Sequence, residues 1–128
     1  MNFTGSILLV DDEAHIRKYV GLILRQLGAP TIFEAANGEE AIALYQREHP
    51  DLVLLDVNMP IMDGMETLKQ LKAIDPACIV VMLTSLTNRQ SVEAALTLGA
   101  SNYIRKDTPK NEITNALSET ISECFETE

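Results

Sequence analysis

Short apolar runs alternate with helical patterns along the whole chain. Residues 7–10, 52–55 and 79–83 are continuously apolar. These runs are too short for buried helices and are typical of parallel strands buried on both faces. Two weaker strand candidates lie at residues 31–35 and 102–105. The pattern therefore predicts five strands.

Apolar residues recur at helical spacing after each of these strands. The expected helices cover residues 14–27, the stretch from a cap at Asn37 to just before Pro50, residues 64–74 with Asp63 as the cap, residues 88–98, and residues from Pro109 to about 125. Strands that alternate with helices favour a doubly wound α/β fold with one parallel sheet and helices on both faces. At 128 residues, we expect one domain over residues 1–128 and no output domain.

The composition of the chain limits which classes of molecule it can bind. The chain is 46% hydrophobic and carries a formal net charge of -9, which repels nucleic acid and anionic membranes. No apolar run has the length of a membrane span, and the N-terminus lacks the layout of a signal peptide. We therefore expect a cytoplasmic protein whose partners are proteins or cations.

Polar side chains follow four of the expected strands. Asp11 and Asp12 follow the first, Asp56 the third, Thr84 the fourth and Lys106 the fifth. Because the carboxyl ends of parallel strands share one edge, these groups should converge there. Carboxylates about 5 Å apart repel by about 3 kcal/mol per pair at an effective dielectric near 20, so the cluster should need a cation.

Oxygen ligands without ordered His or Cys favour Mg²⁺ or a similar hard ion. A hard cation and a lysine beside one carboxylate are the groups that phosphoryl transfer requires, with that carboxylate as the nucleophile. Neutralising Asp11 or Asp12 with Asn should also stabilise the metal-free protein, since it removes repulsion.

These motifs resemble the receiver domain of two-component response regulators. The resemblance is carried by Asp11-Asp12, by Asp56 in DVNMPIMDG, by Thr84-Ser85, and by GASNYIRK with Tyr103 and Lys106. It covers almost the whole chain and implies a flavodoxin-like sheet of strand order 2-1-3-4-5.

The resemblance also implies residue roles. Asp56 would accept a phosphoryl group from the phosphohistidine of a sensor histidine kinase or histidine phosphotransfer protein. Mg²⁺ would be bound by Asp12, Asp56 and the backbone carbonyl of Asn58, with Asp11 acting through water. The phosphoryl oxygens would be held by Thr84, the amide of Ser85 and Lys106.

The same resemblance implies how phosphorylation would be passed on to a target protein. Thr84 and Tyr103 would act as the switch, and a target protein would bind the face made by the fourth helix, fifth strand and fifth helix. Basic residues on that face predict an acidic target; they are Arg89, Arg105 and Lys110. We expect a phosphorylation-driven switch, which acts by binding another protein or by relaying phosphate, and not an enzyme that turns over a separate substrate.

Two residues depart from the family pattern. Leu86 stands where many relatives carry a polar side chain, and Asp107 follows Lys106 where the family usually has proline. Because a cis bond before a non-proline residue costs about 2.5 to 4 kcal/mol, we expect Lys106–Asp107 to be trans. Neither departure removes a group that phosphorylation needs.

Two other functions fit the same fold class. A flavodoxin-like binder of small molecules would need backbone amides and glycine in the first strand-helix turn, whereas Asp11-Asp12-Glu13 would repel a phosphate there. A Mg²⁺-dependent phosphatase with Asp56 as nucleophile typically needs a second acid two residues on, where this chain has Asn58.

Overall fold

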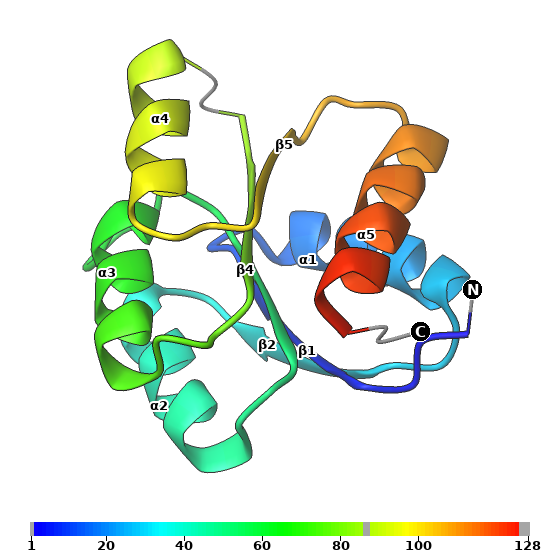
Figure 1. Cartoon of the computed structure of the whole chain (residues 1–128), viewed down its shortest axis with the longest axis horizontal. Coiled ribbons are helices and arrows are strands. Elements are labelled where there is room, and N and C mark those ends of the chain that lie inside the picture. Colours follow the sequence, from blue (N-terminus) through cyan, green and yellow to red (C-terminus); the bar gives the residue numbers. More distant parts are fainter. Residues whose placement is uncertain (1, 86–87, 126–128) are drawn as a thin grey trace.

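One parallel sheet organises the chain (Figure 1). The computed structural model describes residues 2–85 and 88–125. Within those residues the strands are β1 (Ser6–Val10), β2 (Thr31–Ala35), β3 (Leu52–Leu55), β4 (Val80–Thr84) and β5 (Asn102–Arg105). Their order is β2-β1-β3-β4-β5, and every pair is parallel. The predicted fold class and strand order are confirmed.

Helices connect the strands and lie close to their expected positions. They are α1 (Ala14–Leu24), α2 (Gly38–Glu48), α3 (Gly64–Ile74), α4 (Arg89–Thr97) and α5 (Lys110–Phe125). The first helix is shorter than expected, because the chain tightens into a 3-10 turn, η1 (Arg25–Leu27), before the left-handed Gly28. The fourth strand lies one residue later than expected and includes Thr84. No helix in the described part of the chain is both long and apolar enough to cross a bilayer.

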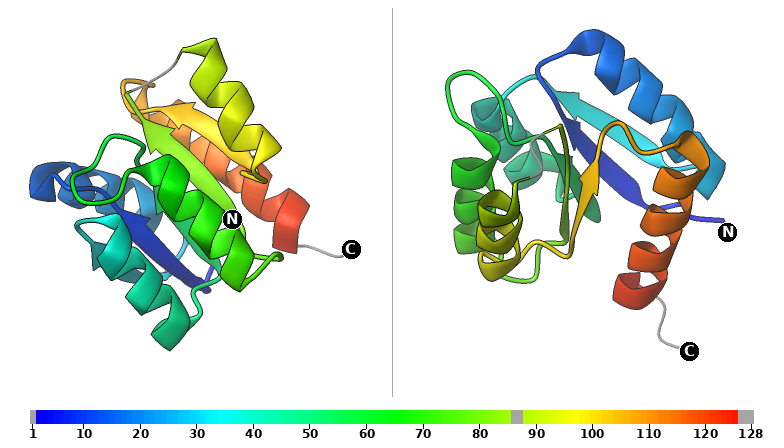
Figure 2. Two further views of the ribbon diagram at one scale, coloured as in Figure 1. Left: turned by 90° about the vertical axis from the view of Figure 1, so that its left-hand side faces the viewer. Right: turned by 90° about the horizontal axis from the view of Figure 1, so that it is seen from above.

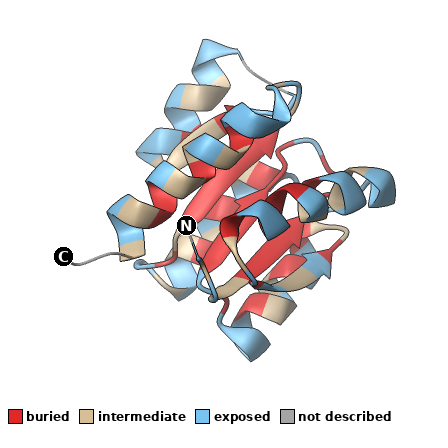
Figure 3. Cartoon of the chain, turned by 90° about the vertical axis from the view of Figure 1, so that its right-hand side faces the viewer, coloured by how far each residue is buried: buried red, intermediate tan, exposed pale blue. Residues whose placement is uncertain are grey.

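The sheet separates two hydrophobic cores. Helices α2, α3 and α4 cover one face, and α1 and α5 cover the other (Figures 1 and 2). Alternate residues of one strand enter different cores: Val53 and Leu55 face the first, and Leu52 and Leu54 the second. All four are 0% exposed, and the strands form the buried centre in Figure 3. Burial on both faces is why these strands read as continuous apolar runs.

Side-chain caps fix where three helices begin. The carboxamide oxygen of Asn37 accepts from the Glu40 amide at 2.9 Å, and a carboxylate oxygen of Asp63 accepts from the Glu66 amide at 2.9 Å. Asn88 caps α4 in the same way. The carboxylate of Glu40 accepts from the amide of Ala36, one residue before the cap. Such caps satisfy amides that have no partner within the helix.

Candidate functional site

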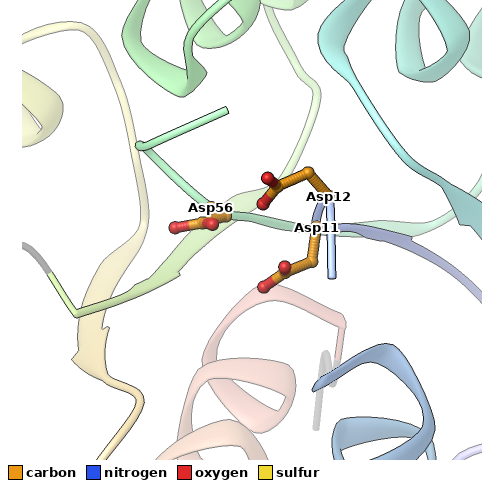
Figure 4. Close-up of side chains that lie close together, drawn as sticks. All are labelled: Asp11, Asp12 and Asp56. Atoms are coloured by element: carbon orange, nitrogen blue, oxygen red, sulfur yellow. The ribbon is translucent and has the colours of Figure 1, made fainter. Parts of the chain in front are cut away.

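Two neighbouring strands end in carboxylates that lie together at one edge of the sheet (Figure 4). Asp11 and Asp12 follow β1, and Asp56 follows β3. One carboxylate oxygen from each residue lies within 4.8 Å of those of the other two. The parallel pairing of β1 with β3 thus brings together side chains that are far apart in the sequence.

Asp11 and Asp12 have different surroundings although they are adjacent. Asp11 is 2% exposed, and its Oδ1 accepts from the Glu13 amide at 2.9 Å. Its own amide donates to the carbonyl of Ala35 at 3.1 Å. Asp12 is exposed. Asp11 is therefore a fixed part of the turn into α1, whereas Asp12 presents its carboxylate to solvent.

Lys106 reaches these aspartates from the end of β5. Its Nζ lies 2.5 Å from Oδ2 of Asp11 and 3.1 Å from Oδ2 of Asp56, and its side chain is 14% exposed. Burial of the ammonium acts to lower the pKa of Lys106, but Asp11 and Asp56 outweigh that effect and raise the pKa above its ordinary value. The ammonium therefore stays charged and offsets part of the negative charge.

Thr84 and Ser85 stand where β4 reaches the same edge. Thr84 is fully buried, and its carbonyl accepts from the Lys106 amide at 3.0 Å. Ser85 is exposed. The neighbouring Leu86 lies outside the described residues. The hydrogen bond between Thr84 and Lys106 fixes the start of the chain segment that carries the ammonium.

Tyr103 lies on the face of the sheet that α2, α3 and α4 cover, where it packs against the first core. Its pKa is raised, first by burial and then by the negative charge of Asp56. The phenol is therefore within electrostatic reach of the carboxylate cluster. Tyr103 thus packs against the same core that Ala95 of α4 enters.

The loop from Asp56 to Gly64 closes on itself. The Gly64 amide donates to the carbonyl of Val57 at 2.7 Å, and a Cβ at Gly64 would stand 2.0 Å from the carbonyl oxygen of Asp56. A glycine is required at this close approach of two backbone segments. Asn58 is exposed, and its amide donates to Oδ1 of Asp56 at 3.4 Å.

The segment after Lys106 has a trans backbone, as expected, since the described residues contain no cis peptide bond.

The Arg105 guanidinium donates to both carboxylate oxygens of Asp107, at 2.9 and 2.7 Å. On α4, Arg89 pairs with Glu93 at 2.7 Å. Each of these two arginines has an acidic partner that offsets its charge, and the basic output face stays a prediction.

The donor set fits a hard divalent cation. The converging ligand atoms are all carboxylate oxygens, which Mg²⁺ prefers. Asp12 is open to solvent, so a hydrated ion has access. The short contact between Lys106 and Asp11 shows that the cluster already gathers positive charge.

Sequence reasoning missed Arg17, which supports the loop that carries Asp11 and Asp12. Its Nη1 donates to the carbonyl of Asp11 at 2.6 Å, and its Nε donates to Oε1 of Glu34 at 2.9 Å. The side chain is 18% exposed. The sequence did contain an indication of this role. A cation in the first turn of a helix is unfavourable beside the helix dipole, so its presence there suggests a specific hydrogen-bonding partner.

Comparisons with known proteins agree with this geometry. Residues 7–118 match the family described as response regulator receiver domain. Chemotaxis protein CheY of Bacillus subtilis is 34% identical over 116 residues, which are 91% of this chain and 97% of that protein. Sporulation initiation phosphotransferase F of the same bacterium is 38% identical over 111 residues, which are 87% of this chain and 89% of that protein.

Solved structures give the same result. A chain of the CheX-CheY-BeF3-Mg²⁺ complex from Borrelia burgdorferi matches with a TM-score of 0.86 and 30% identity, over 96% of this chain and 90% of that chain. A CheY-like receiver domain protein from Methanospirillum hungatei matches with a TM-score of 0.86 and 27% identity, over 95% and 97% of the two chains. These matches support the receiver hypothesis, and they give no support to the flavodoxin-like binder or the phosphatase.

Proposed function

Given that this chain belongs to the family of response regulator receiver domains, we propose that Asp56 accepts a phosphoryl group from a phosphohistidine. The observation that carries the proposal is the position of Asp56. Asp56 is 3% exposed and follows a central strand, and its carboxylate lies beside both the Asp11-Asp12 pair and the ammonium of Lys106. The phosphohistidine would belong to a sensor histidine kinase or a histidine phosphotransfer protein.

The reaction forms one bond and breaks one. A carboxylate oxygen of Asp56 bonds to phosphorus while the phosphorus–nitrogen bond of the phosphohistidine breaks. The electron pair of that bond stays on the imidazole nitrogen, and the product on Asp56 is an acyl phosphate. Lys106, the Thr84 hydroxyl and the Ser85 amide would then hold the phosphoryl oxygens, where their positive charge and donors stabilise the transferred group.

Mg²⁺ would be held by Asp12, Asp56 and the carbonyl of Asn58, with Asp11 acting through water. When bound, the ion supplies positive charge that offsets charge on the phosphoryl oxygens. The exposure of Asp12 and the convergence of three carboxylates support this assignment. The relative from Borrelia burgdorferi was solved as a complex that contains Mg²⁺.

Phosphorylation would switch the binding of a target protein. The new group adds roughly -1.5 to -2 charge at Asp56. Movement of the Thr84 hydroxyl toward this charge would let Tyr103 rotate inward and change the surface of α4, β5 and α5. The position of Tyr103 against the core that α4 enters supports this route.

Within residues 1–128, the chain would act as one receiver domain in the cytoplasm. Its partners would be the phosphoryl donor and the target, without binding to nucleic acid or membrane. The net charge of -9 supports that choice of partners. The only chemistry would be on its own Asp56, so the protein would be a switch and not a turnover enzyme.

Mass measurement after incubation with acetyl phosphate and Mg²⁺ tests the proposal. The wild type should gain one phosphoryl group, and omission of Mg²⁺ should prevent most of the gain. Asp56→Asn should remain unlabelled, whereas Asp107→Asn, which removes an exposed carboxylate outside the cluster, should be labelled like the wild type. Equal labelling of Asp56→Asn and the wild type would refute the assignment of Asp56.

A further inference from the structure

Arg17 ties the loop of the carboxylate cluster to the edge strand β2. Its guanidinium stands between the carbonyl of Asp11, at 2.6 Å from Nη1, and the carboxylate of Glu34, at 2.9 Å from Nε. Arg17 belongs to the first turn of α1, and no acidic residue of that turn offsets its charge. Because a cation is unfavourable at that end of a helix, the two hydrogen bonds account for its presence.

The two bonds restrain the backbone from which Asp12 projects. The Asp11 amide is held by the carbonyl of Ala35, and the Asp11 carbonyl is held by Arg17. The two peptide groups that flank Asp11 are thus both held, and the bond from Arg17 is the one that holds the Asp11–Asp12 peptide. Asp12 follows directly after this peptide and is the least buried member of the cluster.

Only arginine can make this pair of contacts. The planar guanidinium offers donors in fixed, different directions, whereas a lysine ammonium is a single point on a flexible stem. Glu34 also neutralises the guanidinium, so the restraint places no net positive charge beside a cation site. Arg17 and Glu34 together can therefore hold the loop without adding net charge beside the cluster.

We propose that Arg17 is a positioning residue for the Mg²⁺ site, which it serves by holding the Asp11–Asp12 peptide so that the Asp12 carboxylate stays directed toward Asp56. The inference rests on the proposed Mg²⁺-binding function. Residues that hold metal ligands in place contribute to metal affinity although they do not touch the ion. Arg17 would act on the ion through the backbone and would not touch it.

The proposal is tested by whether Arg17→Met strengthens or weakens the binding of Mg²⁺. If Arg17 acted only through its charge, Arg17→Met would bind Mg²⁺ more tightly, because a nearby cation would be gone. If Arg17 positions the loop, Arg17→Met should bind about three- to tenfold more weakly, somewhat less than the ~10- to 100-fold typical of direct partners of metal ligands. Calorimetric titration of the full chain with MgCl₂ gives the dissociation constants.

Three further variants complete the test. Arg17→Lys keeps the charge but cannot make both contacts, so its affinity should resemble that of Arg17→Met. Glu34→Gln should weaken Mg²⁺ binding in a salt-dependent way, because it leaves the guanidinium charge uncompensated. Arg89→Met removes another arginine that pairs with a glutamate, on α4, and should leave the affinity unchanged.

A readout of stability separates positioning from a purely structural role. A structural role would lower the melting temperature equally with EDTA and with Mg²⁺, whereas a positioning role also reduces the rise that Mg²⁺ causes. Unchanged or tighter Mg²⁺ binding by Arg17→Met would overturn the inference. A wild type that binds Mg²⁺ but takes up no phosphoryl group would refute the proposed phosphoryl transfer alone, and one that binds no Mg²⁺ would overturn both.

Discussion

The ammonium of Lys106 lies closer to Asp11 than to Asp56, at 2.5 Å from the carboxylate of the first and 3.1 Å from that of the second. The site without metal therefore has an internal cation that bridges two strands. Under the proposed function, Mg²⁺ would bind beside this ammonium and share carboxylates with it. The two cations oppose each other, and their competition can be measured.

Replacing Lys106 by Met should tighten Mg²⁺ binding. The substitution keeps an unbranched apolar stem and removes one positive charge. A unit charge about 5 Å away is worth about 1 kcal/mol in water and about 3 kcal/mol at an effective dielectric of 20, so we expect a gain of about tenfold. Calorimetric titration with MgCl₂ measures it. Unchanged or weaker binding would show that the ammonium does not oppose the ion.

The structure distinguishes Asp12 from Asp11 in the metal-free protein. Asp12→Asn should raise the free energy of unfolding in EDTA by about 0.5 to 1 kcal/mol, because an exposed carboxylate gains little from its neighbours and repels them. Asp11→Asn removes the partner of Lys106 inside a buried pair and should lower that free energy. Urea unfolding in EDTA decides between them. Equal changes in the two variants would contradict the different surroundings of the two carboxylates.

Gly64 and Gly21 give a matched pair of glycine substitutions. A Cβ at Gly64 would meet the Asp56 carbonyl at 2.0 Å, whereas a Cβ at Gly21 meets nothing within 4 Å. Gly64→Ala should destabilise the protein by about 2 to 4 kcal/mol, since backbone must move. Gly21→Ala, inside α1, should stabilise it by about 0.5 to 1 kcal/mol. Urea unfolding measures both. A stable Gly64→Ala variant would contradict the close approach.

The hydrogen bond from Tyr45 to Asp75 predicts a pH dependence of stability. The Tyr45 hydroxyl donates to Oδ2 of Asp75 at 2.8 Å. This bond, followed by that from the Ala77 amide, lowers the pKa of Asp75. A carboxyl whose pKa is lowered on folding contributes stability above its unfolded pKa of about 3.9, and loses it as the pH falls through the folded value.

Tyr45→Phe should therefore be less stable than the wild type at pH 7, with a difference that shrinks below about pH 4. Urea unfolding at pH 7, 5 and 3 measures the difference. Tyr19→Phe is the control, because Tyr19 is 41% exposed. A difference between wild type and Tyr45→Phe that stays constant over this pH range would assign the loss to packing and not to Asp75.

Phosphorylation should change amide chemical shifts on the α4, β5 and α5 face. Tyr103 packs against the same core as Ala95 and the partly buried Leu98, so a rotation of its ring must alter that packing. Two-dimensional NMR spectra before and after treatment with acetyl phosphate and Mg²⁺ report the change. Asp56→Asn should show none of it. Shifts that spare residues 88–121 in the wild type would exclude this face as the output surface.

The sequence predicts most of the backbone because burial leaves a direct pattern. Leu52–Leu55 must avoid water on both faces, and only a run of apolar residues satisfies that requirement. The caps at Asn37 and Asp63 were predictable for a similar reason, since few side chains can satisfy the first helix amides. Once the strands are predicted, their carboxyl ends are known as well. The groups that converge at that edge of the sheet could therefore be predicted, although the distances between them could not.

Contacts that depend on side-chain length and direction could not be predicted. Nothing in the sequence indicates that Lys106 approaches Asp11 more closely than Asp56, or that Arg17 reaches back to the loop before its helix. Ile61 adopts a positive φ of 70°, which the branched Cβ disfavours, so sequence rules would have chosen another residue there. The hydrogen bond from Tyr45 to Asp75 depends on side-chain direction in the same way.

The bridge made by Lys106 also bears on how the chain folds during synthesis. Lys106 and Asp56 are separated by 50 positions, and β5 is the last strand to leave the ribosome. Contacts between distant residues form late, because the ends of a long loop must first be brought together. In a nascent chain whose β1 paired with β3 before β5 was synthesised, Asp11 and Asp56 would lie side by side without the ammonium of Lys106. For that interval dissolved cations would be the counter-charge, so their concentration should affect how readily β1 and β3 pair.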